Sequence, residues 1–398
     1  MIQRRDFLFA AAAAGLTPAV LGAAPNASDE EAVSPLGRAL VLSGGGARGA
    51  YEAGLVGALA ARTQDGAPLP GYDLVCGTSI GALNGWFVAT GQYSKMKSLW
   101  YGVSGQGLVQ AKRQFAALQD PDSGLFNRAA SALELMGLTK SDKAVLDTQA
   151  VYEWIARHID PATPLLVPLI WAVTNLTQQR PEYFYLRPQG APPDLPQRVV
   201  HALQLLLGPH TVVREATADN LHKAIFASAA LPLAFDPVLM PGPDGVMNAY
   251  CDGGVASNSP VGIAHAVSKA ADVVLLDPPF QPETSYDSAV DIAFGIYGTM
   301  QRKILEVEMR STYFQSIGKR AYAGRARQTS LTSDEDALLD TFMKTVISTE
   351  LRYIRPKKTL PVTVVGFNDE VGIGKAYRIG WEDASRDFTK YDWRTFEL

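Results

Sequence analysis

The stretch Gly77-Thr78-Ser79-Ile80-Gly81 decides how the rest of this chain is interpreted. It is a Gly-x-Ser-x-Gly pentapeptide, a pattern that places a serine on a sharp turn between a strand and a helix. The apolar residues 74–76 before it predict a short buried strand, and the run 82–89 after it predicts a largely apolar helix. Strand, tight turn and helix are what a nucleophile elbow needs, so Ser79 is the candidate nucleophile.

Short apolar runs alternate with helical stretches from residue 38 onward. This alternation predicts an α/β fold, a sheet with helices on its faces. Helices are expected at 50–61 and after Pro260, and the segment 288–315, which contains few helix breakers, predicts a long amphipathic helix. The runs expected to form strands are 39–42, 74–76, 169–174, 247–251, 273–276 and 362–365.

A glycine-rich loop, Ser43-Gly44-Gly45-Gly46-Ala47-Arg48-Gly49, directly follows the first predicted strand and opens a helix. Its accessible N–H groups and the helix N-terminus suit a phosphate or the oxyanion of an acyl-transfer intermediate. Gly44, Gly46 and Gly49 also have the dinucleotide-binding spacing, so a nucleotide site is the alternative. The acidic residue that such a site needs about twenty residues further on has no convincing candidate, since Asp65 lies in a turn-like stretch.

Asp252 is the candidate partner of the serine, because it ends a predicted strand and two glycines follow it. An isolated Asp-Gly-Gly is usually a turn. Here the pattern continues through Val255, Asn258 and Ser259 to Pro260, which suits the start of the next helix.

Taken together, four blocks resemble the patatin-like phospholipase family. Gly-Gly-Gly-x-Arg-Gly occurs at 44–49, Gly-x-Ser-x-Gly at 77–81, Ala-Ser-x-Ala-x-Pro at 227–232 and Asp-Gly-Gly-Val-x-x-Asn-x-Pro at 252–260. The blocks stand in the order of the family, and the resemblance covers roughly residues 36–277. It implies a patatin-like three-layer α/β/α fold with a mostly parallel central sheet.

The resemblance also implies a serine lipid acyl hydrolase, of the phospholipase A or carboxylesterase type, that works through a Ser-Asp dyad and an acyl-enzyme. Ser79 matches the nucleophile and Asp252 the general base that accepts its proton. The oxyanion hole is expected at Gly44, Gly45, Gly46 and the N–H of Ile80. The supporting motif positions are Arg48, Gly49, Gly77, Gly81, Gly253 and Gly254. A lipid acyltransferase with the same dyad and a non-catalytic lipid-binding protein are the alternatives.

The histidines offer a second catalytic hypothesis. Of five, only His265 follows Asp252, which gives the Ser-Asp-His order of a triad, but it falls inside the helix predicted after Pro260. We therefore expect a packed or surface histidine. Arg48 is expected either to meet an anionic headgroup or to bond neighbouring carbonyls, and Ser228 to be structural. No cluster has metal-ligand spacing, so we expect no metal and no organic cofactor.

Composition limits the partners. The chain has 398 residues, is 47% hydrophobic and carries a formal net charge of −4, which argues against a nucleic-acid binder. The expected partner is an acyl lipid or a membrane phospholipid, and the sequence leaves the oligomeric state open. Peripheral membrane contact through basic residues is weighed against a solvated face. These residues are Arg302, Lys303, Arg310, Lys319, Arg320, Arg325, Arg327, Arg352, Arg355, Lys357 and Lys358.

The N-terminus resembles an export signal. Arg4-Arg5 precedes an apolar, alanine-rich run, so residues 1–27 are interpreted as a twin-arginine signal peptide rather than a membrane anchor, and the protein as periplasmic or secreted. Residues 36–277 are expected to form the catalytic domain, with insertions near 102–148 and 177–220. Residues 278–398 are expected to form a C-terminal extension packed on the same domain. Cys76 and Cys251 are expected as buried thiols rather than a disulfide.

Overall fold

The computed structural model describes residues 36–110, 112, 144, 146–190, 200, 203–204, 211–279, 289–325 and 346–397. The predicted signal peptide at 1–27 and most of the insertion expected near 102–148 lie outside the described residues. So does Arg327 of the basic group.

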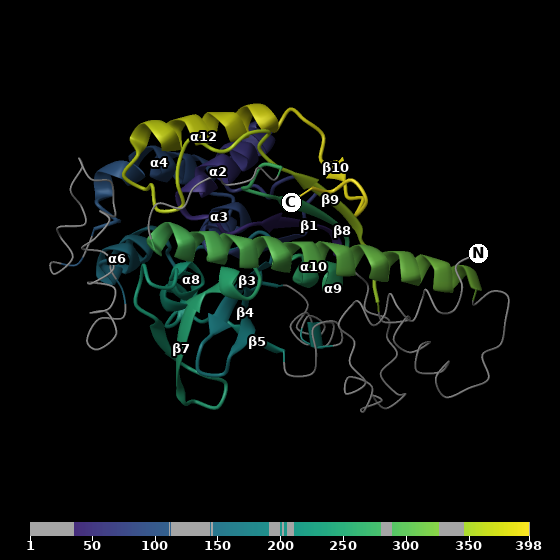
Figure 1. The fold of residues 1–398 in the computed structure, drawn as a ribbon, viewed down its shortest axis with the longest axis horizontal. Helices are drawn as coiled ribbons and strands as arrows, with labels where there is room; N and C mark the ends of the chain where they lie inside the picture. The colour runs from purple at the N-terminus through teal and green to yellow at the C-terminus, as the bar shows by residue number, and fades with distance from the viewer. Residues whose placement is uncertain are drawn as a thin grey trace.

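A ten-stranded sheet runs through the described part of the chain in the order β10-β9-β8-β1-β2-β3-β4-β5, with β7 on β3 and β6 on β7 (Figure 1). Its central strands are all parallel: β1 (Leu36–Leu42), β2 (Leu74–Thr78), β3 (Leu169–Asn175), β8 (Ser268–Val274) and β9 (Glu350–Ile354). The outer strands are β4 (Arg180–Leu186), β5 (Val212–Glu215), β6 (Val238–Pro241), β7 (Met247–Asp252) and β10 (Thr389–Lys390).

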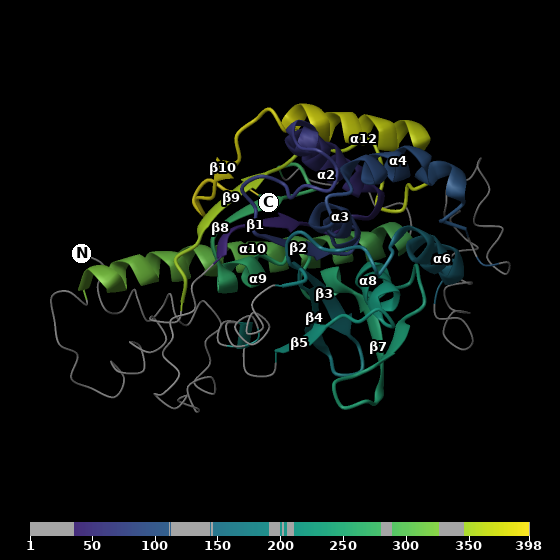
Figure 2. The same ribbon diagram turned by 180° about the vertical axis from the view of Figure 1, so that it is seen from behind.

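Helices cover both faces of this sheet (Figures 1 and 2). One layer contains α2 (Gly49–Leu59), α3 (Ile80–Ala89), α4 (Tyr93–Gly102), α6 (Thr148–His158), α8 (Leu221–Ala229) and α12 (Glu370–Asp383). The other contains α9 (Val261–Val267) and α10 (Ala289–Arg325). The strand residues alternate between two hydrophobic cores, as Leu40 and Leu42 of β1 face the first layer and Ala39 and Val41 face the second. The predicted three-layer α/β/α fold with a mostly parallel sheet is confirmed.

Two sequence-based assignments need correction. The run 362–365 is no strand, because β9 already occupies the place beside β8 and the chain enters the run from Pro361. Its Val364 carbonyl instead accepts a hydrogen bond from Ala47 N in the glycine loop, at 2.9 Å. The segment 177–220, expected as an insertion of loops and one helix, contains β4 and β5 of the sheet.

The register of β3 brings the ends of β2 and β7 together. β4 pairs with one edge of β3 along its whole length, so β2 and β7 share the other edge. Thr78 of β2 is in register with Ala172, and Asp252 of β7 is in register with Val173, the next residue along β3. The two strands run in opposite directions and therefore meet end to end, with Ser79 and Asp252 at the junction.

Other features of the described residues bear on function. None of their helices is long and apolar enough to cross a bilayer. Cys76 and Cys251 are both buried free thiols, as expected. The C-terminal part of the chain enters both the sheet, through β9, and the helical layers, through α10 and α12.

Candidate active site

Ser79 lies on a strained turn. Its φ of 56° and ψ of −125° form a backbone conformation that is rare outside glycine. The flanking glycines are required by close contacts: a Cβ at Gly77 would lie 2.4 Å from Gly81 O, and one at Gly81 would lie 2.3 Å from Leu42 O. The local sequence therefore folds as a nucleophile elbow.

Ser79 and Asp252 form the centre of the site. Ser79 Oγ donates to Asp252 Oδ2 at 2.6 Å, and the two residues are 7% and 3% exposed. The other carboxylate oxygen, Oδ1, accepts from Gly254 N at 2.6 Å and from the Tyr297 hydroxyl at 3.5 Å. Burial raises the pKa of Asp252 to about 6, and these hydrogen bonds oppose the rise.

The glycine loop lies beside the serine, since a Cβ at Gly44 would be 3.2 Å from Ser79 Cβ. Gly44 N donates to Asn258 O at 2.8 Å, so this N–H is not free to meet an oxyanion. No acceptor for the N–H groups of Gly45, Gly46 or Ile80 is found among the described residues. Three of the four predicted oxyanion positions thus keep an available donor.

The remaining motif residues hold the loops in place. Arg48 pairs with Asp277 at 2.5 Å and donates to Gly45 O at 3.4 Å, which is the structural one of its two predicted roles. Ser228 Oγ accepts from Ser79 N at 2.8 Å and donates to Ala172 O at 2.7 Å, so it braces the elbow. Gly49 allows α2 to approach Ile80, and Gly253 packs against the Ala172 carbonyl.

His265 does not join the site. Its Nδ1 lies 2.9 Å from Thr349 Oγ1 and its Nε2 lies 2.9 Å from Gln315 Oε1, so both ring nitrogens have partners elsewhere. Burial lowers its pKa to about 4, which keeps the ring neutral. The Ser-Asp-His alternative has no geometric support.

Sequence reasoning missed a buried polar network beneath the glycine loop. Asn84 Nδ2 donates to Glu52 Oε2 at 3.1 Å and to Gly49 O at 3.0 Å, while Trp100 Nε1 donates to Asn84 Oδ1 at 2.9 Å. Burial raises the pKa of Glu52 to about 8, although the Asn84 amide and Ser43 N–H oppose the rise. No motif signals this network, because it joins residues on three helices that only the fold brings together.

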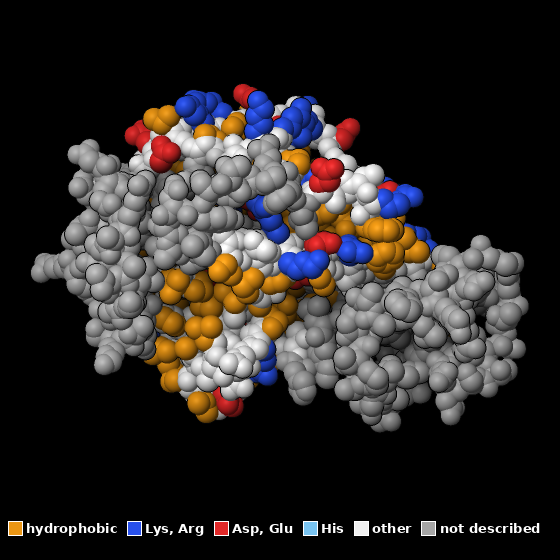
Figure 3. Space-filling model, in the orientation of Figure 1, with side chains coloured by type: hydrophobic (Ala, Val, Ile, Leu, Met, Phe, Trp, Pro, Cys, Tyr) orange, Lys and Arg blue, Asp and Glu red, His pale blue; other side chains and the backbone are white. Residues whose placement is uncertain are grey.

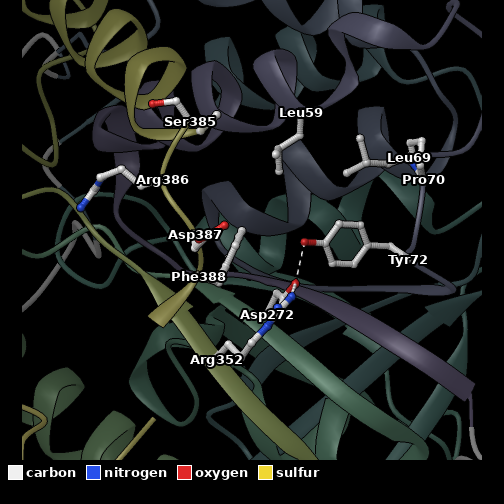
Figure 4. A pocket seen from close by; sticks show the side chains of 11 residues that line it. Leu59, Leu69, Pro70, Tyr72, Asp272, Arg352, Ser385, Arg386, Asp387 and Phe388 are labelled. Carbon is white, nitrogen blue, oxygen red and sulfur yellow. Dashed lines mark hydrogen bonds and ion pairs between the residues drawn. The ribbon is translucent and has the colours of Figure 1, made fainter. Parts of the chain in front are cut away.

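A pocket elsewhere in the sheet does not belong to the site. Its lining includes Asp272, which accepts from the Tyr72 hydroxyl at 2.8 Å (Figure 4). Asp272 also pairs with Arg38 and Arg352. Ser79 and Asp252 are not among its lining residues. Within the described ranges, no group of His, Cys, Asp and Glu side chains gathers that could hold a metal ion.

The three-layer fold and the serine on its elbow define an α/β protein of the nucleophile-elbow class. The family model of Patatin-like phospholipase matches residues 40–265, more than half of the chain. The chain therefore belongs to the patatin-like phospholipase family, and this membership supports a lipid acyl hydrolase in general.

Other comparisons are more distant. No curated protein matches the chain. Among solved structures it is similar to VipD from Legionella pneumophila, with 15% sequence identity and a TM-score of 0.32. That likeness covers 88% of this chain and 66% of VipD, so the chain spans just under two thirds of VipD's length.

Proposed function

We propose that this protein hydrolyses acyl-lipid esters, as a serine hydrolase of the phospholipase A or carboxylesterase type, through Ser79 and Asp252. The observation that carries the proposal is the 2.6 Å hydrogen bond between Ser79 Oγ and Asp252 Oδ2 in a buried site. Membership of the patatin-like phospholipase family supports the lipid substrate.

The reaction proceeds in two halves. Asp252 accepts the hydroxyl proton while Ser79 Oγ attacks the ester carbonyl carbon, and the tetrahedral intermediate collapses to an acyl-enzyme. Asp252 returns the proton to the departing alcohol. A water molecule then gives a proton to Asp252 and attacks the acyl carbon. Collapse of the second intermediate releases the fatty acid and restores the Ser79 hydroxyl.

Two features support this chemistry without histidine. The pKa of Asp252, raised by burial to about 6, makes it a stronger base than an ordinary carboxylate near ~4 while leaving it ionised at neutral pH. The N–H groups of Gly45, Gly46 and Ile80 are the proposed oxyanion donors. Loss of one such donor costs about 3–4 kcal/mol of transition-state stabilisation in comparable sites.

We also propose peripheral contact with a lipid surface, through apolar rather than basic side chains. Figure 3 shows a hydrophobic area that runs from α10 over the strands below it. Exposed apolar residues lie on the β3–β4 turn, the β6–β7 hairpin and the start of α10: Leu176, Leu239, Val246, Met247, Ile296 and Met300.

Several of the basic residues that sequence analysis singled out have acidic partners nearby. Lys303 and Arg310 both pair with Glu306, and Arg352 pairs with the buried Asp272. Surface pairing of this kind reduces the net attraction to anionic lipid. The apolar area reaches α10, whose Tyr297 contacts Asp252, so a lipid docked there would lie close to the dyad.

Ser79→Ala and Asp252→Asn test the proposed function. We expect each purified variant to fold, judged by its thermal unfolding, and to lose lipid ester hydrolysis, because one loses the nucleophile and the other its base. Lipid profiling of the products formed by the unchanged protein and by Ser79→Ala identifies the bond cleaved. Turnover retained by either variant would rule out the dyad.

A further inference from the structure

The helix α10 contacts the loop 252–260, which follows β7 and is called here the active-site loop, near both ends of that loop. Tyr297 reaches Asp252, where the loop begins, and Gln301 Nε2 donates to Asn258 Oδ1 at 3.0 Å. Further along, Glu308 accepts from Ser257 Oγ at 2.6 Å and from Val261 N at 3.2 Å. These α10 residues are spaced four and seven apart, so they share one face of the helix. α10 lies outside residues 40–265, the part matched by the family model.

From this geometry we propose that Tyr297 is a positioning residue, which holds the Asp252 carboxylate in its ionised form and oriented toward Ser79. The inference rests on the proposed dyad and extends it to a residue of α10.

The carboxylate has few other means of stabilising its charge. Its hydrogen bonds come from the Ser79 hydroxyl, Gly254 N and the Tyr297 hydroxyl. No Lys, Arg or His of the described residues pairs with it. A buried carboxylate without a cation is held ionised by the hydrogen bonds that it accepts.

The ionisable side chains next to Asp252, Tyr297 and Cys251, are both uncharged at neutral pH. Burial, followed by the nearby Asp252 charge, raises the pKa of Tyr297 well above its ordinary value, so its hydroxyl keeps its proton. Burial likewise raises the pKa of the Cys251 thiol to about 12, so that group is also uncharged at neutral pH. Gly254 N fixes the same oxygen, Oδ1, from the backbone, and only Tyr297 can be altered by a side-chain substitution without disturbing Ser79.

The test is the pH dependence of Ser79 reactivity in Tyr297→Phe. The rate constant for labelling of Ser79 by a fluorophosphonate is measured between about pH 4.5 and pH 8.5, together with lipid ester hydrolysis. Loss of the donor should raise the acid midpoint, which we expect near 6 in the unchanged protein from the pKa of Asp252. We expect labelling about threefold to tenfold slower near pH 5 and within about twofold near pH 8. Tyr313→Phe, which removes a hydroxyl from the same helix where Tyr313 packs on Phe314 and Tyr391, should leave the profile unchanged.

Replacing Tyr297 with 3,5-difluorotyrosine gives a test in the opposite direction and preserves the shape of the side chain. A more acidic phenol donates a stronger hydrogen bond, so the acid midpoint should fall. Midpoints that stay in place in both variants, or an equal loss of rate at every pH, would show that Tyr297 acts only as a structural contact. Labelling without lipid turnover in the unchanged protein would defeat the proposed substrate and leave this comparison readable. An unchanged protein whose Ser79 is never labelled would overturn the dyad and, with it, the role of Tyr297.

Discussion

At the scale of single residues, the site combines two buried carboxyl groups in different charge states, Asp252 ionised and Glu52 neutral. Asp252, with a pKa near 6, is charged at neutral pH, whereas Glu52, with a pKa near 8, holds its proton. Burial is the main cause of the raised pKa in both carboxyl groups. A neutral Glu52 places no negative charge behind the N–H groups that would receive an oxyanion, so the protonated form suits the proposed chemistry.

Glu52→Gln should make the stability of the protein less dependent on pH. The folded-state pKa of Glu52 exceeds its unfolded value of about 4.5. The folded protein thus binds this proton more tightly than the unfolded chain does. The resulting contribution to the free energy of unfolding is complete below about pH 4.5 and is lost as the pH rises toward about 8. The loss is at most ~1.4 kcal/mol per pH unit. Thermal unfolding between about pH 5 and pH 9 should show the unchanged protein losing more stability than Glu52→Gln.

The exposed Glu153→Gln is the matched control and should follow the unchanged protein. Parallel curves for Glu52→Gln and the unchanged protein would contradict a protonated Glu52.

At the scale of elements, glycines set the distance between α2 and α12. A Cβ at Gly54 would lie 1.9 Å from Tyr377 O, and one at Gly380 would lie 1.9 Å from Tyr51 O. The two backbones therefore touch at their crossing. Because α2 begins at the glycine loop, this crossing also fixes the position of the proposed oxyanion donors relative to the sheet.

Gly54→Ala should force the two helices apart and destabilise the protein by about 1–3 kcal/mol. Chemical denaturation measures the loss, and a slower esterase reaction should accompany it. Gly374→Ala is the control on α12, where an added Cβ meets nothing within 4 Å. That variant should be neutral or gain up to about 1 kcal/mol from helix propensity. Equal stabilities for the two variants would show that the crossing tolerates a methyl group.

The sequence alone predicts the structure where a short local pattern determines it. The buried strands β1 and β3 each contain an unbroken apolar run, at 39–42 and 169–173, and the glycines around Ser79 mark its turn. By contrast, the strand β4 begins with Arg180, Pro181 and Glu182 rather than with apolar residues, and one of its two partner strands, β5, follows only at Val212. The role of Tyr297 had no signal, since an amphipathic pattern predicts the helix but not which of its side chains meets Asp252.

At the scale of the whole molecule, the proposed lipid contact is the hydrophobic area on α10 and the strands below it (Figure 3). Leu239 and Met247 are both more than half exposed, so replacing both with serine should leave folding intact. We expect this double variant to bind neutral phosphatidylcholine vesicles at least about tenfold more weakly, because apolar burial drives the contact. Flotation of vesicles measures binding. Val371→Ser, an exposed position on α12, should bind like the unchanged protein.

One outcome of the flotation experiment would favour contact through the basic residues instead. Binding confined to anionic vesicles, and abolished by about 0.5 M salt, would assign the contact to electrostatic attraction.

Export is the second prediction for the whole chain. Arg4→Lys combined with Arg5→Lys should retain the protein in the cytoplasm, because the twin arginines are the proposed export signal. Immunoblots of the cytoplasmic and periplasmic fractions measure the distribution. An unchanged periplasmic fraction would argue for another route.

The end-to-end meeting of β2 and β7 on β3 sets the order in which synthesis can produce an active chain. The elbow leaves the ribosome early, but Asp252, the proposed base, follows 173 residues later. A nascent chain that ends before Asp252 therefore lacks the carboxylate proposed to take the serine proton, and we expect it to be inactive toward the lipids of the cell that makes it.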